Sequence, residues 1–398
     1  MRILMVSSYL PYPLFSGGHI RLYNLIKNLN ERHEITLVCE KRENQNQNDI
    51  NEVSKICKRL VVIERKKQWS LGNVIKTGFS MSPFLVTGHK NPQMRQALEK
   101  LLSTEQFDLV HVETFYVMQN LPAGKAGFPQ AHIPIVLVEH NVEHLVYERF
   151  VKKAMLLLRP LLFIDVLKLK RLEKAYWGKA DKLIAVSPKE AKLMGRDAEI
   201  IPNGVDIEKF KMKKIDKTRK KIKVLFIGDF RWIQNRDSVV YIIKNVWPRV
   251  ISKNPNLTLW IVGKNIPESL KKLANPSIIF DEDAPDETEQ IFQSADVLLS
   301  PIRIGGGTNF KILESMASGT PVITTSLGNE GIEAKNGEEI ILCEKPEEFI
   351  NKTLLLLSDD YLYEKISRNA RKFVEKNFDW KNIAQKLENV YQSLTRNS

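Results

Sequence analysis

The sequence predicts an α/β protein built from two doubly wound parallel-sheet domains. The chain has 398 residues, which exceeds the roughly 100 to 200 residues of a usual domain. Short apolar runs alternate with longer amphipathic ones along its whole length, which is typical of strand–helix units around a mostly parallel sheet. The composition, 43% hydrophobic and 27% charged, is that of an ordinary globular protein.

The short apolar runs are the candidate strands. In the first half they are Arg2–Val6, Glu34–Cys39, Arg59–Ile63, Leu109–Val112, Pro134–Glu139 and Lys182–Ala185. In the second half they are Lys223–Gly228, Thr258–Gly263, Ser277–Phe280, Val297–Pro301, Pro321–Thr324 and Glu339–Leu342. The turn-forming segment Ile201–Asp206 separates the two sets. We therefore expect one domain at 1–200, a second at 201–378, and a final amphipathic helix at 379–393.

The net charge of +13 is concentrated in the first half, where residues 1–200 hold 30 basic and 20 acidic side chains. Such an excess of positive charge favours binding to nucleic acid or to an anionic membrane surface. No nucleic-acid-binding motif accompanies the charge, so we expect no nucleic acid partner and keep the membrane as a candidate. The apolar stripe from Met155 to Phe163 belongs either to the core or to a membrane interface. It is too short and interrupted to span a bilayer.

The cysteines and the amino terminus favour a cytoplasmic protein, either free or peripheral on the inner face of the plasma membrane. Cys39, Cys57 and Cys343 lie far apart and show no metal or redox spacing. The first apolar run ends at Ser7, too early for a signal peptide. No metal site and no resident cofactor are expected. The remaining histidines are expected to be packing or surface residues: His19, His33, His89, His111 and His132.

Two glycine-rich segments follow predicted strands. Gly17 and Gly18 precede a helical pattern, and glycines at a helix start let phosphate approach the backbone amides. The second segment is stronger. It comprises Gly305, Gly306 and Gly307, then Thr308 as the expected helix cap, Asn309, and Lys311 in the first helical turn. Lys311 and Glu314 share one helix face, which suits phosphate and sugar hydroxyls respectively and otherwise makes an exposed ion pair.

The ordered set of motifs resembles glycosyltransferase family 4, the group 1 glycosyl transferases. The motifs are Gly17-Gly18, Val138–Asn141, Ala180–Ser187, Ile201–Asp206, Phe226–Gly228, Ser294–Val297 and the segment from Lys311 to Ser326. The resemblance implies the GT-B fold, in which two Rossmann-like domains face each other across a cleft. It implies a retaining, metal-independent transfer from a nucleotide sugar, most simply a UDP- or GDP-sugar, to a hydroxyl acceptor. The family-level acceptor is a bacterial surface polysaccharide or a lipid-linked glycan.

The resemblance also assigns roles to residues. Glu314 matches a glutamate that binds the donor ribose, and His140 matches a histidine near the donor sugar. Glu139, His140 and Glu143 are the candidates for orienting the acceptor hydroxyl. The first signature glutamate falls at Gly306, so the usual carboxylate contact to the donor sugar is missing. The donor set is completed by Gly228, Arg231, Gly263 and Arg303. The family's Arg and Lys after the strand ending at Gly228 have no obvious match, and the candidate substitutes are Arg231, Arg236, Arg303 and Lys311.

Other functions stay open at this point. His140–His144 matches the His-x-x-Glu-His pattern of inverted zinc peptidases, although His140 follows a strand directly instead of lying in a helix. The same fold also serves sugar-nucleotide epimerases and phosphorylases. A protein that only binds nucleotide would show tight binding without turnover.

Overall fold

The computed structural model describes residues 1–65, 68, 70–122, 133–214, 221–283, 288–305 and 307–396. The chain forms two compact units. Unit 1 comprises Met1–Pro202 and Ile383–Ser398, and unit 2 comprises Asn203–Asn382. The chain therefore passes from one unit to the other at two places.

Unit 1 is built on a seven-stranded parallel sheet with the order β3-β2-β1-β4-β5-β6-β7. The strands are β1 (Arg2–Ser7), β2 (Glu34–Lys41), β3 (Arg59–Glu64), β4 (Leu109–Glu113), β5 (Ile135–Glu139), β6 (Lys182–Ala185) and β7 (Ala198–Ile200). The central strands β1 and β4 are buried almost throughout, because helices cover both faces of a parallel sheet. Met5 of β1 lies in register with Leu37 on one side and His111 on the other.

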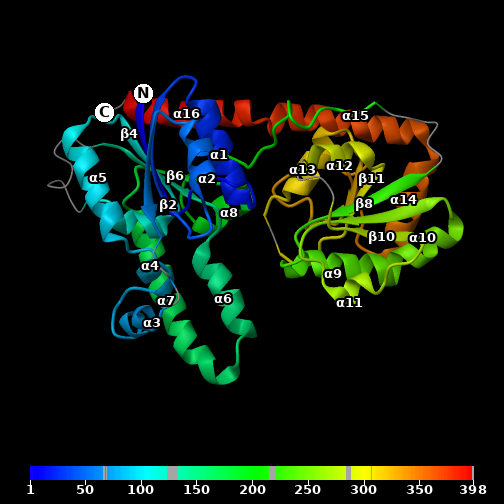
Figure 1. Cartoon of the computed structure of the whole chain (residues 1–398), viewed down its shortest axis with the longest axis horizontal. Helices are drawn as coiled ribbons and strands as arrows, with labels where there is room; N and C mark the ends of the chain where they lie inside the picture. Colours follow the sequence, from blue (N-terminus) through cyan, green and yellow to red (C-terminus); the bar gives the residue numbers. More distant parts are fainter. Residues whose placement is uncertain are drawn as a thin grey trace. The chain divides into compact units, whose positions relative to one another are not determined.

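Helices cover this sheet (Figure 1), and several of them begin at a side-chain cap. The helix α8 shows the pattern: the Ser187 side chain accepts a hydrogen bond from the Glu190 amide, Pro188 opens the helix, and Gly195 ends it at φ 64°. The helices are α1 (Gly17–Leu29), α2 (Gln47–Ser54), α3 (Leu71–Gly78), α4 (Phe84–Gly88), α5 (Pro92–Thr104), α6 (Glu143–Lys153), α7 (Arg159–Trp177) and α8 (Pro188–Met194), with 3-10 turns η1 (Phe115–Asn120) and η3 (Leu156–Leu158).

Unit 2 repeats this plan with a six-stranded parallel sheet in the order β10-β9-β8-β11-β12-β13. The strands are β8 (Ile222–Ile227), β9 (Leu257–Val262), β10 (Ile278–Asp281), β11 (Val297–Ser300), β12 (Val322–Thr324) and β13 (Ile341–Leu342). The helices are α9 (Ile233–Tyr241), which continues through a π-helical turn η4 (Ile242–Val246) into α10 (Trp247–Lys253), then α11 (Glu268–Lys271), α12 (Thr288–Ser294), α13 (Phe310–Ala317), α14 (Pro346–Ser358) and α15 (Asp360–Asn377).

The last helix, α16 (Trp380–Thr395), begins in unit 2 and ends in unit 1. In unit 1, the carboxylate of Glu388 lies 2.7 Å from Arg32 and 3.2 Å from His33. The Tyr391 hydroxyl lies 2.6 Å from His111 Nδ1. The predicted amphipathic helix at 379–393 is therefore an integral part of unit 1 from Ile383 onwards.

Every predicted strand has a counterpart within two residues at each end, and the two-domain parallel α/β fold is confirmed. The edge strand β7 was missed. It is three residues long and two of them are exposed, so it carries no apolar run. In the described ranges, no helix combines the length and the apolar character needed to cross a membrane.

Candidate active site

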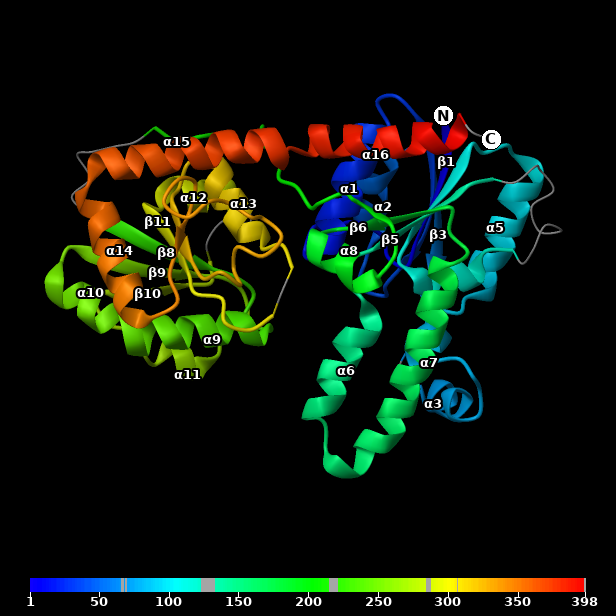
Figure 2. The ribbon, with the colours of Figure 1, turned by 180° about the vertical axis from the view of Figure 1, so that it is seen from behind.

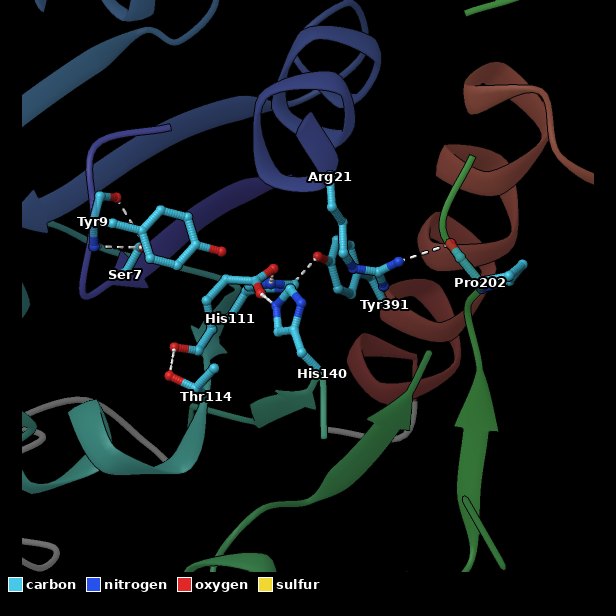
Figure 3. Close-up of polar contacts among 9 residues, drawn as sticks. Ser7, Tyr9, Arg21, His111, Thr114, His140, Pro202 and Tyr391 are labelled. Carbon is cyan, nitrogen blue, oxygen red and sulfur yellow. Dashed lines mark hydrogen bonds and ion pairs between the residues drawn. The ribbon is translucent and has the colours of Figure 1, made fainter. Parts of the chain in front are cut away.

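The carboxylate of Glu113 is the centre of a buried cluster in unit 1. Glu113 is the last residue of β4, and none of its side chain is exposed. One carboxylate oxygen lies 2.9 Å from His111 Nε2 and the other lies 2.6 Å from His140 Nε2. His111 and Glu113 are two apart on a strand and so share a face. His140 follows β5, the neighbouring strand (Figure 3).

These two hydrogen bonds keep Glu113 ionised. Burial by itself raises the pKa of this carboxyl, but the hydrogen bonds from His111 and His140 outweigh burial and hold the pKa well below its ordinary value. An ionised carboxylate only accepts hydrogen bonds, so both Nε2 atoms donate. The His140 side chain is 18% exposed, whereas those of Glu113 and His111 are fully buried. His140 is therefore the member of this cluster that can meet a ligand.

Two helical residues complete the cluster in unit 1. Tyr391 of α16 contacts His111 Nδ1, and a hydroxyl that donates there leaves the His111 proton on Nε2, where Glu113 accepts it. Arg21 of α1 is fully buried and donates to the carbonyl of Pro202 at 2.7 Å. Burial lowers the pKa of Arg21, and the negative charge of Glu113 opposes that shift. Figure 3 shows both side chains beside the two imidazoles.

The amino end of α1 opens beside this cluster. The Ser16 hydroxyl makes no cap hydrogen bond and lies 2.6 Å from His19 Nδ1. A Cβ added to Gly18 would lie 3.0 Å from Tyr9 Oη and 3.9 Å from His140 Cε1, so the glycine keeps this space open. The first amides of a helix have no intrahelical partner. The geometry leaves room for the anion-binding role of Gly17 and Gly18, which stays a prediction.

Glu139 does not join His140. Successive residues of a strand point to opposite faces of the sheet. Glu139 accordingly turns away and accepts a hydrogen bond from Trp177 Nε1 at 3.1 Å, with only 1% of the residue exposed. Burial, and then the charge of Glu173, raise the pKa of Glu139 well above its ordinary value. Glu139 is therefore buried against a structural partner, and this geometry gives no support to its role in orienting the acceptor hydroxyl, which stays a prediction.

The His-x-x-Glu-His pattern does not form a metal site. His140 precedes α6 and binds Glu113, whereas His144 lies within α6 and binds the Glu173 carboxylate through Nδ1. Within the part of the chain that the structure describes, no group of three or more His, Cys, Asp or Glu side chains could hold a metal ion. The peptidase interpretation therefore finds no support. Glu143 lies at the start of α6, and burial, followed by the charge of Glu173, raises its pKa to about 7.

In unit 2 the predicted phosphate loop lies between β11 and α13. Gly305 and Gly307 adopt φ values of 111° and 81°, which favour glycine. Gly306, predicted to donate an amide to the pyrophosphate, lies outside the described residues. The Gly307 amide donates to a carboxylate oxygen of Glu330 at 3.3 Å. That amide is thus directed at an acidic group in this structure.

The cap of α13 differs from the prediction. Asn309, and not Thr308, is the N-cap residue, and its side chain makes no cap hydrogen bond. The Asn309 amide group donates instead to the carbonyl of Gly328 at 3.1 Å. Thr308 Oγ1 is buried and makes no hydrogen bond with any described group. The first amides of α13 are therefore not covered by a capping side chain.

Lys311 is held in place at the start of α13. Its Nζ donates to Asn235 Oδ1 at 2.8 Å and lies 4.5 Å from the centre of the Phe226 ring. Asn235 is itself fixed, because its Nδ2 donates to the carbonyl of Asp229 at 2.7 Å. Burial lowers the pKa of Lys311 to about 7, and the charge of Glu314 opposes this shift. Lys311 is thus a positioned amine whose protonation responds to a nearby anion.

Glu314 has the opposite shift. Burial raises its pKa to about 7, while the charges of Lys209 and Lys311 act against burial. No ion pair joins Glu314 to Lys311, so the alternative interpretation of an exposed ion pair does not hold for these two described residues. No described residue donates a hydrogen bond to the Glu314 carboxylate. Its oxygens can accept hydroxyl groups of a ligand.

The two predicted arginine ligands already have carboxylate partners. Arg231 binds Asp229 at 2.5 Å. Arg303 binds Asp237 through two hydrogen bonds of 3.0 and 2.8 Å and lies 4.4 Å from the centre of the Tyr241 ring. Both guanidinium groups are therefore engaged inside unit 2. The role of either arginine as a substitute phosphate ligand gains no support from this geometry.

Close packing explains why glycine occurs at positions 228 and 263. A Cβ on Gly228 would lie 2.6 Å from the Asn235 side chain, which holds Lys311. A Cβ on Gly263 would lie 1.8 Å from the Gly228 carbonyl oxygen, and Gly263 has a φ of 154°. The two glycines thus let the ends of β8 and β9 approach each other. Their contact with donor stays a prediction.

Sequence reasoning missed the partners that position the candidate ligands. Glu113 binds His140, His111 binds Glu113, and Tyr391 binds His111. Asn235 holds Lys311. His111 was expected to be a simple packing residue, yet it has polar partners on both nitrogens. The sequence did carry a signal for His111 and Glu113, because a His and a Glu two residues apart at the end of a strand point to the same side of the sheet. Asn235 and Tyr391 carried no such signal.

Comparisons with known proteins agree with the resemblance. Residues 15–209 match the family model for Glycosyltransferase Family 4, and residues 221–359 match that for Glycosyl transferases group 1. An uncharacterized 44.6 kDa protein in the cps region of Klebsiella pneumoniae is 24% identical, over 96% of this chain and 97% of that protein. An Escherichia coli UDP-Gal:alpha-D-GlcNAc-diphosphoundecaprenol alpha-1,3-galactosyltransferase is 25% identical, over 76% of this chain and 79% of that enzyme.

Solved structures of similar fold cover the whole chain. The sucrose-phosphate synthase of Thermosynechococcus elongatus superposes with a TM-score of 0.70 at 16% identity, covering 100% of both chains. Anabaena HepE in complex with UDP and glucose superposes with a TM-score of 0.66 at 15% identity, covering 99% of this chain and 100% of that one. The two parallel α/β units and the two family matches together show that the chain belongs to the group 1, family 4 glycosyltransferases, which have the GT-B fold.

Proposed function

We propose that this glycosyltransferase moves a sugar from a UDP-sugar to a hydroxyl group of a lipid-linked glycan, with retention of anomeric configuration and without a metal. The observation that carries the proposal is the pair Lys311 and Glu314 at the start of α13. An amine fixed by Asn235 and a carboxylate with no described hydrogen-bond donor lie on one helix face. Lys311 can bind a diphosphate, and Glu314 can accept hydrogen bonds from the vicinal hydroxyls of a ribose.

The reaction needs stabilisation of a leaving diphosphate. The bond between the anomeric carbon and the diphosphate oxygen breaks, and its electron pair leaves with UDP. The acceptor oxygen bonds to the same face of that carbon, and its proton passes to a diphosphate oxygen. The amides at the start of α13, together with protonated Lys311, would neutralise the charge that develops on UDP.

The cluster in unit 1 would serve the sugar and acceptor hydroxyls. With Nε2 donating to Glu113, the Nδ1 atom of a neutral His140 can accept a hydroxyl hydrogen bond. The acceptor class is proposed from the galactosyltransferase relative, whose name specifies a diphosphoundecaprenol-linked sugar. UDP is proposed over GDP because that relative and the HepE complex both carry uridine nucleotides in their names.

Calorimetry on the full chain tests the proposal. UDP should bind in the presence of EDTA and more tightly than GDP, and Glu314→Gln should weaken UDP binding by roughly tenfold or more, since each good hydrogen bond to a charged group contributes about 1.5–3 kcal/mol. Glu338→Gln, at an exposed glutamate of the same unit, is the matched control. UDP release from a UDP-sugar on adding a polyprenyl-diphosphate glycan tests transfer. Equal UDP affinity in Glu314→Gln and wild type would refute the site.

A second experimental outcome would support the proposed donor site but assign it a different reaction. If the purified chain binds UDP-N-acetylglucosamine and converts it to an isomer without any acceptor, the enzyme is an epimerase of the same fold. Proton NMR of the sugar product, including the anomeric coupling, separates epimerisation from transfer and shows whether configuration is retained.

A further inference from the structure

Helices α6 and α7 form an antiparallel hairpin that extends away from the sheet of unit 1. Figures 1 and 2 show the two helices side by side and the turn between them far from the strands. The base of the hairpin is tightly held, because Glu173 of α7 accepts hydrogen bonds from the amides of Glu143 and His144 at 2.7 and 3.3 Å. Trp177 and Leu169 are buried there. These contacts therefore hold the hairpin in place as an integral part of unit 1.

The far end of the hairpin is apolar and exposed. Leu157 is 89% exposed, Leu156 75% and Met155 70%. The full set of exposed large apolar side chains on the hairpin is Val146, Phe150, Met155, Leu156, Leu157, Leu158, Leu161, Phe163, Ile164 and Leu167. The sequence assigned the stripe from Met155 to Phe163 either to the core or to a membrane interface. The structure shows that it is not part of the core. A contiguous exposed apolar patch of this kind marks an interaction surface.

A second exposed apolar group lies beside α7. It consists of Val74, Ile75, Phe79 and Met81, in and just after α3, and Phe79 is 93% exposed. Two contacts fix it to the hairpin: Lys168 Nζ donates to the Thr77 carbonyl at 2.8 Å, and the Phe84 amide donates to Asp165 at 3.0 Å. Both figures show α3 next to α7.

The charges around the patch are mostly positive. Residues 148–171 contain seven Lys or Arg and two Asp or Glu. Both acidic groups are occupied, since Glu148 binds Lys152 at 2.9 Å and Asp165 accepts the Phe84 amide. Arg149, Lys170 and Arg171 are exposed, and none of them pairs with a described carboxylate. The patch thus combines apolar side chains with exposed cations, one of which, Lys170, also acts through its charge on Glu148.

A groove between α6 and α7 is likewise lined by apolar side chains and cations. Its volume is about 320 Å³, and it is lined by Glu148, Val151, Lys152, Arg159, Pro160 and Phe163. Apolar side chains form most of its wall and two cations lie at it. Apolar groups that insert below the headgroups and cations that meet anionic headgroups are the two parts of an interfacial membrane anchor.

We propose that the tip of the α6–α7 hairpin, with the apolar group after α3, inserts into the interfacial layer of a bilayer that contains anionic lipids. The exposed leucines enter the acyl boundary, and Arg149, Lys170 and Arg171 bind lipid phosphates. This docking does not depend on the transferase reaction. Its use in bringing unit 1 to a lipid-linked acceptor does rest on the proposed function.

Vesicle flotation of the full chain, without donor or acceptor, tests the docking. The protein should float with phosphatidylcholine vesicles that contain about 30 mol% phosphatidylglycerol, and much less with pure phosphatidylcholine. Changing Leu156, Leu157 and Leu161 to Ser should reduce the bound fraction roughly tenfold, because three inserted side chains are lost. The matched control changes three exposed apolar residues elsewhere to Ser: Leu193, Leu355 and Tyr361.

A charge variant separates the two contributions. Changing Arg149, Lys170 and Arg171 to Gln should abolish the preference for phosphatidylglycerol and the sensitivity to salt, while the same change at exposed Lys335, Lys372 and Lys386 should keep both. UDP affinity and the unfolding temperature should stay at wild-type values in every variant. This distinguishes failed docking from a failed donor site.

Several results would overturn the proposal. Absence of flotation with anionic vesicles would refute it, as would equal flotation of the leucine variant and its control. Sedimentation showing that wild type is a dimer and the leucine variant a monomer, without lipid binding, would assign the patch to a second copy of the chain.

Discussion

The two units share one strand order and differ in the chemistry at the carboxyl ends of their strands. Both sheets place the first strand of the unit in the middle and wind outwards in the same sequence. Unit 1 stabilises a charge, because two imidazoles keep the buried Glu113 ionised. Unit 2 destabilises two charges, because burial brings the pKa of both Lys311 and Glu314 to about 7. The fold places the sites, and the local hydrogen bonds decide which groups are prepared for a ligand.

The largest expected effect concerns Lys311. Lys311→Met keeps the length of the side chain and removes the charge, so kcat/KM should fall about 10²- to 10³-fold, as when one group that stabilises the transition state is lost. Steady-state release of UDP from the donor measures this. Lys335→Met, at an exposed lysine, should keep wild-type kinetics. A loss of less than threefold in Lys311→Met would remove unit 2 from the leaving-group role.

Glu113→Gln tests whether unit 1 depends on a fixed charge. The amide cannot accept from both imidazoles as the carboxylate does, so His140 loses its position. We expect kcat to fall about 10²-fold, in the range of acid–base contributions, with the KM for donor nearly unchanged and the pH profile shifted. Glu99→Gln, at an exposed helix position, is the control. A uniform loss of folded protein with normal pH dependence would indicate a structural role only.

The pH dependence of nucleotide binding separates the units further. Lys311 has a pKa of about 7 without ligand, and a bound diphosphate raises it, so binding takes up a proton above that pH. UDP affinity should therefore fall between pH 7 and pH 9, by up to about tenfold per pH unit. Calorimetry in two buffers of different ionisation enthalpy measures the proton uptake. Lys311→Met should bind weakly at every pH and take up fewer protons than wild type, because Glu314, whose pKa is also about 7, still titrates.

The smallest expected effect concerns Tyr391. Tyr391→Phe removes the hydrogen bond to His111 and leaves the ring in place, which should lower the free energy of unfolding by about 1–2 kcal/mol. Urea denaturation measures this. Activity should stay within a few-fold of wild type, because Glu113 still binds both imidazoles. Tyr361→Phe, at an exposed tyrosine, is the neutral control.

Sequence patterns located the fold and singled out His140, Lys311 and Glu314 as candidate ligands. Strands were found because buried parallel strands are continuous apolar runs, and β7 was missed because it has none. Lys311 and Glu314 were found together because helical spacing links them. Asn235 lies 76 residues from Lys311, and Tyr391 lies 280 residues from His111. Such contacts exist only after the sheets are assembled, and no local period indicates them.

The same reasoning applies to the surroundings of Glu139. Glu139 adjoins His140 in sequence, and both were predicted to orient the acceptor hydroxyl. Alternation along the strand directs Glu139 to Trp177, and the carboxylate partner of His140 comes instead from the neighbouring strand at Glu113. Arg231 and Arg303 each have an aspartate partner within unit 2, which the sequence did not indicate, and their role as phosphate ligands stays a prediction.

The passage of the chain from unit 2 back into unit 1 within α16 affects how such enzymes can be recombined. Unit 1 is encoded by two separate stretches of the gene, and the second supplies Glu388 and Tyr391 to its core. A chimera joined at the single boundary near Pro202 would combine the first stretch of one parent with the α16 of another, and would mismatch these contacts. Exchange of donor specificity between relatives therefore requires two junctions, one near Pro202 and one near Ile383.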